Sequence, residues 1–242
     1  MKYNLEVCSF TTQSCIIAEE AGAARVELCD NPLEGGTTPS YGAIKNARER
    51  ISIQLFPIIR PRPRDYFYDD DEWQIVIDDI AMCKDLGCDG ISVGVQKSGG
   101  EIDAGRMKRV VELAYPMEVT CNRVFDAVPD PFGALEVLID AGCRRVLTSG
   151  LAETAPGGSG VLRQLVEQSA GRISIMPGAG VRSANIIQLI KDTGAFEYHT
   201  SARIKVASSV EFQNPRVTDT GNMYLADREE LRRIVQIFGE AL

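Results

Sequence analysis

Thiols, carboxylates and an imidazole recur at the ends of short apolar runs along this chain of 242 residues. Glu6 and Cys8 end the first run, and Glu27 and Cys29 end the second. His199, the single histidine, ends the last run. A histidine beside carboxylates can act as a general acid or base, because the imidazole pKa lies near working pH. The candidate catalytic residues are His199, Glu27 and Asp126.

Arginines and glycines follow other runs of the same kind. Arg60 and Arg62 alternate with prolines after the third run, and Arg123 ends the fifth. Guanidinium groups suit carboxylate or phosphate, and glycines such as Gly178 and Gly180 let a backbone approach a phosphate closely. The sequence therefore predicts a small anionic ligand. Its candidate residues are Glu6, Glu27, Arg60, Arg62, Arg123, Ser149, Gly178, Gly180, His199 and Ser201.

The apolar runs themselves predict eight strands separated by helices. The strands are expected at residues 4–8, 25–29, 53–60, 90–94, 118–123, 145–149, 173–176 and 196–199. Segments such as 12–21, 71–86, 130–141 and 183–193 have helical spacing and are followed by glycine, which commonly ends a helix. This alternation is typical of an α/β protein built as a (β/α)8 TIM barrel, whose strand ends converge on one mouth. A doubly wound open sheet is the alternative, although no G-x-G-x-x-G follows the first strand.

Alternation along the strands predicts an unusually polar barrel lumen. The carboxylates expected inside are Glu6, Glu27, Glu118 and Glu197, with Arg25, Arg60 and Arg123 as their cationic partners. Unpaired buried charges are costly, so these groups must find partners. Two interpretations stay open: the lumen is a ligand site, or it is an ion-pair lattice that holds no ligand. His199 is likewise either an acid–base group or a lumen side chain satisfied by a neighbour.

Composition narrows the classes of partner and location. The formal net charge is −8, with 26 Lys and Arg against 34 Asp and Glu. The basic residues form no long stripe, so we expect no nucleic-acid partner. No window approaches the roughly 18 apolar residues of a membrane span, so we expect a cytoplasmic protein with no membrane partner. Seven cysteines without a C-x-x-C pair predict reduced thiols. Those expected to be core residues are Cys15, Cys83, Cys88, Cys121 and Cys143.

We expect residues 1–242 to form a single barrel domain, with 227–242 as its closing helix. Residues 203–225 show no clear period and predict a long loop after the eighth strand. This segment carries apolar side chains such as Val210, Phe212 and Met223. Because so many apolar groups should be covered, the sequence predicts a homo-oligomer, a dimer or larger.

Motifs along residues 3 to 203 resemble the CutC family, the so-called copper homeostasis proteins. They are Glu6-Val7-Cys8, Val26-Glu27-Leu28-Cys29, residues 34–40, Arg60-Pro61-Arg62, residues 123–126, residues 147–150, Met176-Pro177-Gly178 and Glu197-Tyr198-His199 with Ser201-Ala202-Arg203. The resemblance implies a cytoplasmic (β/α)8 barrel, often oligomeric, to which copper binding is attributed. It names no reaction, and a barrel fold alone implies none.

With copper implied by the resemblance, Cys8 and Cys29 are the expected metal ligands. They end adjacent parallel strands, which lie about 4.8 Å apart. Cu(I) is a soft ion that favours thiolates. Glu6 and Glu27 are expected to raise both thiol pKa values and so oppose thiolate formation. Free cysteines are also common in protein cores, which keeps a purely structural role open for this pair.

The chain departs from the family pattern at three places. Asn122 stands where the family usually has a histidine before Arg123, so no imidazole role transfers to that position. Pro63-Arg64 replaces a glycine pair after Arg60-Pro61-Arg62 and adds a cation. In the turn after the seventh strand, Ala179 replaces the middle glycine of a triplet, which restricts its backbone more.

Overall fold

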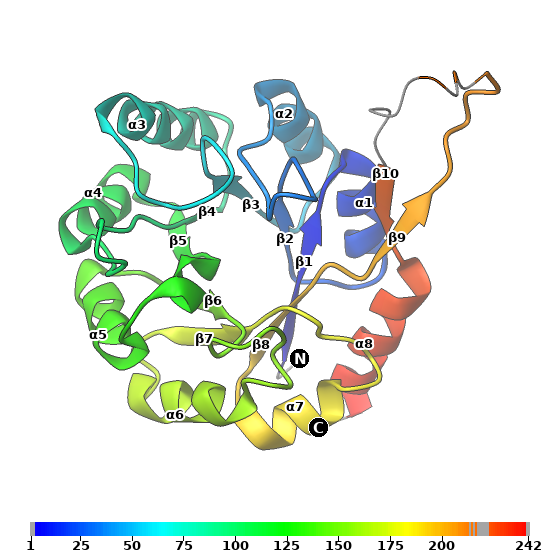
Figure 1. Ribbon diagram of the computed structural model, residues 1–242. Helices are drawn as coiled ribbons and strands as arrows, with labels where there is room; N and C mark the ends of the chain where they lie inside the picture. The colour runs from blue at the N-terminus through cyan, green and yellow to red at the C-terminus, as the bar shows by residue number, and fades with distance from the viewer. Residues whose placement is uncertain (1–2, 213, 215, 217–222, 241–242) are drawn as a thin grey trace.

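A ring of eight parallel strands forms the centre of the molecule (Figure 1). The computed structural model describes residues 3–212, 214, 216 and 223–240. The strands of the ring are β1 (Asn4–Ser9), β2 (Arg25–Leu28), β3 (Gln54–Ile59), β4 (Gly90–Val93), β5 (Glu118–Cys121), β6 (Arg145–Thr148), β7 (Ser174–Pro177) and β8 (Glu197–Thr200). Their order is β7-β6-β5-β4-β3-β2-β1-β8, and β8 returns to lie beside β7. The predicted (β/α)8 barrel and all eight predicted strands are confirmed.

Helices form the outer layer, as Figure 1 shows. They are α1 (Thr12–Glu20), α2 (Tyr41–Arg50), α3 (Asp70–Asp85), α4 (Ala104–Ala114), α5 (Pro131–Ala141), α6 (Ser159–Ser169), α7 (Ile186–Thr193) and α8 (Arg228–Glu240), with a 3₁₀ turn η1 (Arg123–Ala127). Their ends follow the local sequence. Asp69 and Glu72 form a reciprocal capping box at α3, and Pro131 occupies the first turn of α5. Gly142 and Gly194 end α5 and α7 with φ values of 89° and 70°, a conformation that glycine adopts readily.

The hydrophobic core lies between the strands and the helix layer. Leu5, Val7, Val26 and Leu28 of β1 and β2 belong to it and are at most 2% exposed. Where the barrel closes, the phenyl group of Phe238 in α8 packs against Tyr3 and Tyr198. Its centroid lies 5.5 Å from that of Tyr3 and 5.7 Å from that of Tyr198. The closing helix expected at 227–242 is therefore present as α8. No helix among the described residues is long and apolar enough to cross a membrane.

The segment after β8 differs from the predicted loop. Two short strands, β9 (Arg203–Val206) and β10 (Met223–Ala226), pair antiparallel in a separate two-stranded sheet. Between these two strands, residues 207–212 project away from the barrel in Figure 1. Of the segment 203–225, residues 213, 215 and 217–222 lie outside the described residues. The loop prediction missed these strands because alternation over four residues is too short to recognise without the pairing partner.

Candidate functional site

Five charged side chains inside the barrel are joined by continuous ion pairs. We call them the ion-pair network: Glu6, Arg25, Glu118, Arg145 and Glu197. Arg25 contacts Glu6 and also Glu197, its NH2 group lying 2.7 Å from the Glu197 carboxylate. Arg145 contacts that same carboxylate at 2.7 Å and Glu118 at 2.6 Å. The register places Glu6 of β1 beside Arg25 of β2, so the first pair follows directly from the sheet. The network thus joins five of the eight strands across the lumen.

The phenyl ring of Phe56 fills the space beside this network. The guanidinium carbons of Arg25 and Arg145 lie 5.1 and 5.3 Å from its centroid, within cation–π range. Opposite, Gly90 has no side chain, and a Cβ built there would lie 2.2 Å from the Phe56 ring. The glycine is therefore required for the large aromatic ring to lie inside the barrel. It also allows two arginines to be buried against an apolar surface.

Above the network, His199 links Glu6 to the barrel mouth. Its Nδ1 lies 2.7 Å from Glu6 Oε1, and its Nε2 lies 3.8 Å from Glu27 Oε2. Burial alone would raise the pKa of Glu6, but Arg25 and His199 lower it to about 2. Burial lowers the pKa of His199, yet Cys8, Glu6 and Glu27 outweigh it and raise that pKa well above its usual value. His199 is therefore held as a cation next to the ionised carboxylate of Glu6.

Two thiols lie next to this imidazole. Cys29 N–H donates to Ser9 O at 2.8 Å, which continues the β1–β2 pairing and brings Cys29 beside Cys8. The two sulfurs are 3.7 Å apart, and Cys29 Sγ lies 3.5 Å from Glu27 Oε2. One ligand atom from each of Cys8, Cys29 and Glu27 lies within 4.8 Å of the others. The predicted proximity of the two cysteines is confirmed.

The two thiols differ in acidity. A hydrogen bond with Cys29, assisted by His199, overcomes burial and lowers the pKa of Cys8 to about 5. The hydrogen bond with Cys8, burial and Glu27 raise the pKa of Cys29 well above its usual value. The expected net rise in pKa does not occur at Cys8, although Glu6 acts in that direction. The sequence did not reveal that His199 would lie between those carboxylates and the thiol.

Glu27 is the carboxylate of the mouth that has no arginine partner among the described residues. It is 4% exposed. Burial and the neighbouring Cys8 raise its pKa to about 8, with His199 opposing them. At neutral pH this group is therefore mostly protonated and able to donate or accept a hydrogen bond.

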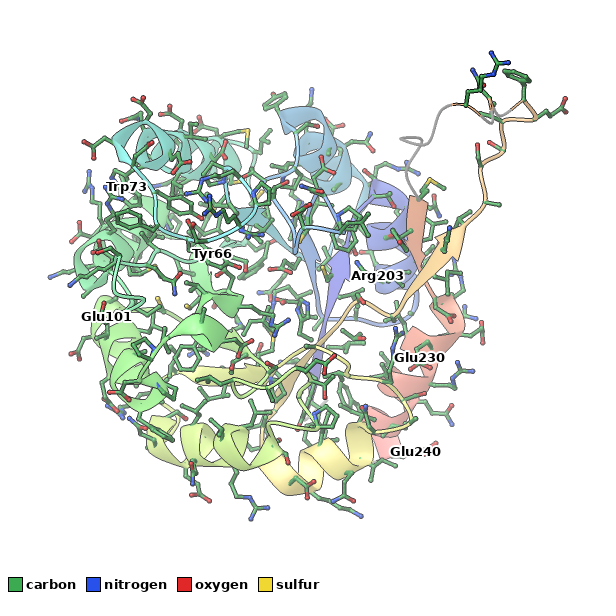
Figure 2. The ribbon with its side chains drawn as sticks, in the orientation of Figure 1. Tyr66, Trp73, Glu101, Arg203, Glu230 and Glu240 are labelled. Atoms are coloured by element: carbon green, nitrogen blue, oxygen red, sulfur yellow. The ribbon has the colours of Figure 1, made fainter. Side chains whose placement is uncertain are left out.

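A cavity of about 310 Å³ opens at the C-terminal ends of the strands, and we call it the mouth cavity. Figure 2 labels Tyr66 and Arg203, two of its lining residues, which come from the loop after β3 and from β9. Of the residues predicted from the sequence, those that line it are Cys8, Glu27, Arg123, Gly180, His199 and Ser201. Cys29 does not line the cavity but lies beside Cys8, and Glu6 is bonded to His199. Chain segments far apart in sequence therefore meet in one site.

Arg60 and Arg62 do not line the cavity, which corrects their predicted role. Arg60 is 3% exposed and donates to the carbonyl oxygens of Glu34 and Arg64, each at 2.8 Å. It fastens the loop after β2 to the loop after β3. Arg62 pairs with Glu72 at the start of α3. Both guanidinium groups are therefore engaged in holding loops rather than directed at the cavity.

Asp126, Ser149 and Gly178 support the site from outside the cavity. Asp126 accepts from Arg123 Nε at 2.7 Å and from Ser149 N–H at 2.9 Å. Arg123 also donates to Ser149 Oγ at 3.1 Å, so the three fix the loop after β6. A Cβ at Gly178 would lie 2.4 Å from Leu147, which lines the cavity. Asp126 is thus held by structural bonds, away from the acid–base position proposed for it.

The sequence did not predict two arginines of the site, Arg145 and Arg182. Arg145 takes the place in the ion-pair network that was predicted for Arg60 and Arg123, whereas the prediction for Arg25 is confirmed. Alternation along β6 puts Arg145 on the same face as Leu147, and this pattern could have identified it. Arg182 lines the cavity from the loop after β7, where its distance from the strand end gave no such pattern.

Comparisons with known proteins agree with the fold and the motif pattern. The family model described as CutC family matches residues 3–204. A CutC family protein of Chromobacterium violaceum is 48% identical over 209 residues, covering 86% of this chain and 85% of its own. One from Parabacteroides distasonis is 48% identical over 218 residues, 90% of each chain. The crystal structure of a protein named for copper homeostasis, CutC from Streptococcus agalactiae, superposes with a TM-score of 0.78 at 30% identity, covering 82% of this chain and 98% of that one.

Proposed function

The chain belongs to the CutC family, and from that premise we propose that it is a copper homeostasis protein that binds Cu(I) through Cys8 and Cys29. The observation that carries the proposal is the pair of sulfurs 3.7 Å apart at the barrel mouth. Cu(I) is a soft ion and prefers thiolates, and two sulfur ligands suit its low coordination number. The residues present therefore fit the ion.

Proton availability supports the same pair. A metal ligand must be a thiolate, and Cys8 has a pKa of about 5, so it is already deprotonated at neutral pH. Cys29 keeps its proton in the free protein, because the neighbouring thiolate and Glu27 disfavour a second negative charge. Binding a cation between the sulfurs removes that repulsion. We expect one proton to be released when the ion binds.

His199 and Glu27 position and balance these ligands. His199, held by Glu6 at 2.7 Å, places a positive charge beside the Cys8 thiolate. Glu27 lies 3.5 Å from Cys29 Sγ and accepts a hydrogen bond from this thiol in the free protein. A reducing cytoplasm is the location that we propose for such a site, because all seven cysteines are free.

Anaerobic titration of the reduced protein against a chromogenic Cu(I) chelator tests the proposal. We expect one tight equivalent in the wild-type protein and its loss in Cys8→Ser and in Cys29→Ser. Cys88→Ser is the matched control, since Cys88 neighbours another thiol, Cys83, away from the mouth. Retention of the tight equivalent in both mouth variants would refute the assignment.

We also propose that the chain forms a homo-oligomer through the region of β9 and β10, with a second copy as the partner. A two-stranded sheet is only marginally stable by itself. Ile204, Val210, Phe212 and Met223 are 47 to 78% exposed, which leaves apolar surface for a partner to cover. Sedimentation velocity at micromolar concentration should show a dimer or larger species. A monomer would refute this, and Phe212→Ser should shift the equilibrium toward monomer.

A further inference from the structure

One buried amide in the mouth cavity has an unused donor. Asn122 directly follows β5 and is 2% exposed. Its Oδ1 accepts from Val124 N–H at 3.0 Å, which fixes the orientation of the amide. Its Nδ2 group has no hydrogen-bond partner within the described residues, although the side chain lines the cavity. A buried donor without a partner costs about 1–3 kcal/mol, so it calls for an acceptor from outside the protein.

The cavity also has an excess of positive charge. Arg182 is half-buried, lines the cavity, and its guanidinium has no ion pair or hydrogen bond among residues 3–212 and 223–240. Arg203 donates to the carbonyl oxygen of Pro32 at 3.0 Å and contacts no described carboxylate. In a protein with a net charge of −8, this local surplus favours an anion.

The turn after β7 adds backbone donors to the same cavity. Ala179 and Gly180 both have left-handed backbones, with φ values of 70° and 73°. Their carbonyl oxygens accept from Ala155 N–H and from Asn185 Nδ2, each at 2.9 Å. The N–H groups of Gly178 and Arg182 donate to Thr148 and Asn185, whereas those of Ala179 and Gly180 have no acceptor among the described residues. Successive N–H groups in such turns are a common way to bind an anion.

We propose that the mouth cavity binds a small organic anion, whose carboxylate or phosphate group is held by Asn122, Arg182 and the turn at Gly180. The cavity volume of about 310 Å³ suits a small metabolite. The remaining part of the bound anion lies against Tyr66 and next to Cys8 and His199. This site does not depend on copper, because none of its anion-binding groups is a proposed metal ligand. It differs from the site predicted from the sequence in using Arg182 instead of Arg60 and Arg62.

Isothermal titration calorimetry of the copper-free protein tests this inference. The probes are inorganic phosphate and malonate, each titrated at ionic strength fixed with sodium chloride. We expect saturable binding of at least one probe, and the probe that binds tells phosphate from carboxylate. Arg182→Ala and Asn122→Asp should each weaken its affinity at least tenfold, because one removes the cation and the other replaces the amide donor with a carboxylate.

Controls separate the site from general charge effects. Arg109→Ala removes the same charge from the outer helix α4 and should change the affinity less than twofold. The titration uses copper-free protein, so a failure of the copper proposal does not affect this result. If Asn122→Asp does not fold, Arg182→Gln serves in its place. Absence of saturable binding of either probe, or equal affinity in wild type and Arg182→Ala, would overturn the inference.

Discussion

In the ion-pair network, Glu6, Glu118 and Glu197 each contact an arginine, whereas at the mouth Glu27 has none in the described part of the chain. The two regions are adjacent layers of one lumen, and His199 joins them through its bond to Glu6. They contain similar side chains, since each has buried carboxylates with a cation nearby. They differ in whether each carboxylate has an arginine partner among the described residues.

The difference separates groups that hold the barrel from groups that can bind a ligand. A buried carboxylate that already has an arginine gains little from an external partner, and removing the arginine leaves an uncompensated charge. At the mouth, Cys8, Glu27 and Asn122 are held in place by neighbours but keep an unused ligand atom or donor. We infer that substitutions in the network chiefly affect stability and substitutions at the mouth chiefly affect binding.

The largest expected effect is the loss of Arg25. Arg25→Met keeps an unbranched apolar side chain but leaves Glu6 and Glu197 without this cation, so we expect the free energy of unfolding to fall by about 3–5 kcal/mol. Urea unfolding at pH 7 measures it. Arg172→Ala is the control, because the Arg172–Glu136 pair is exposed and its loss should cost far less stability.

Cys8→Ser belongs to the same series and should cost clearly less than Arg25→Met, because the thiol is not part of the network. If Arg25→Met and Arg172→Ala proved equally stable, the network would have no special structural role. If Cys8→Ser were as unstable as Arg25→Met, the separation between the two regions would fail.

A smaller effect is expected from pH. The pKa of Glu6 is about 2 in the folded protein against a usual value of 4.5, so its ionised form stabilises the fold above pH 4.5. This contribution should be lost as the pH falls from about 4.5 to about 2. Glu27 has the opposite sign: its pKa is raised to about 8, so its contribution is present below pH 4.5 and is lost as the pH rises to about 8.

Urea unfolding at several pH values separates these two contributions. Glu6→Gln should flatten the loss of stability between pH 4.5 and 2, and Glu27→Gln should flatten the decline between pH 4.5 and 8. An acid limb of unchanged steepness in Glu6→Gln would show that this carboxylate does not carry the effect.

Local pattern predicted the barrel and the meeting of Cys8 with Cys29, because strand alternation and the pairing of consecutive strands determine both. It did not predict the positions of the charged groups at the ends of long side chains. Arg60 follows β3 as expected, yet its flexible stem carries the guanidinium to loop carbonyls. Arg182 comes from a loop whose turn is set by contacts with distant residues, among them Ala155. The positions of groups near the backbone could therefore be predicted, whereas the positions of the arginine guanidinium groups could not.

X-ray absorption at the copper edge of the Cu(I)-loaded protein tests the central proposal most directly, because it identifies the atoms bound to the ion. We predict a low-coordinate site with two sulfur neighbours in the wild-type protein. In Cys8→Ser and in Cys29→Ser the two-sulfur signal should be lost, while Cys88→Ser should match the wild type. A spectrum dominated by nitrogen or oxygen neighbours in the wild type, or one unchanged in both mouth variants, would contradict copper binding by Cys8 and Cys29.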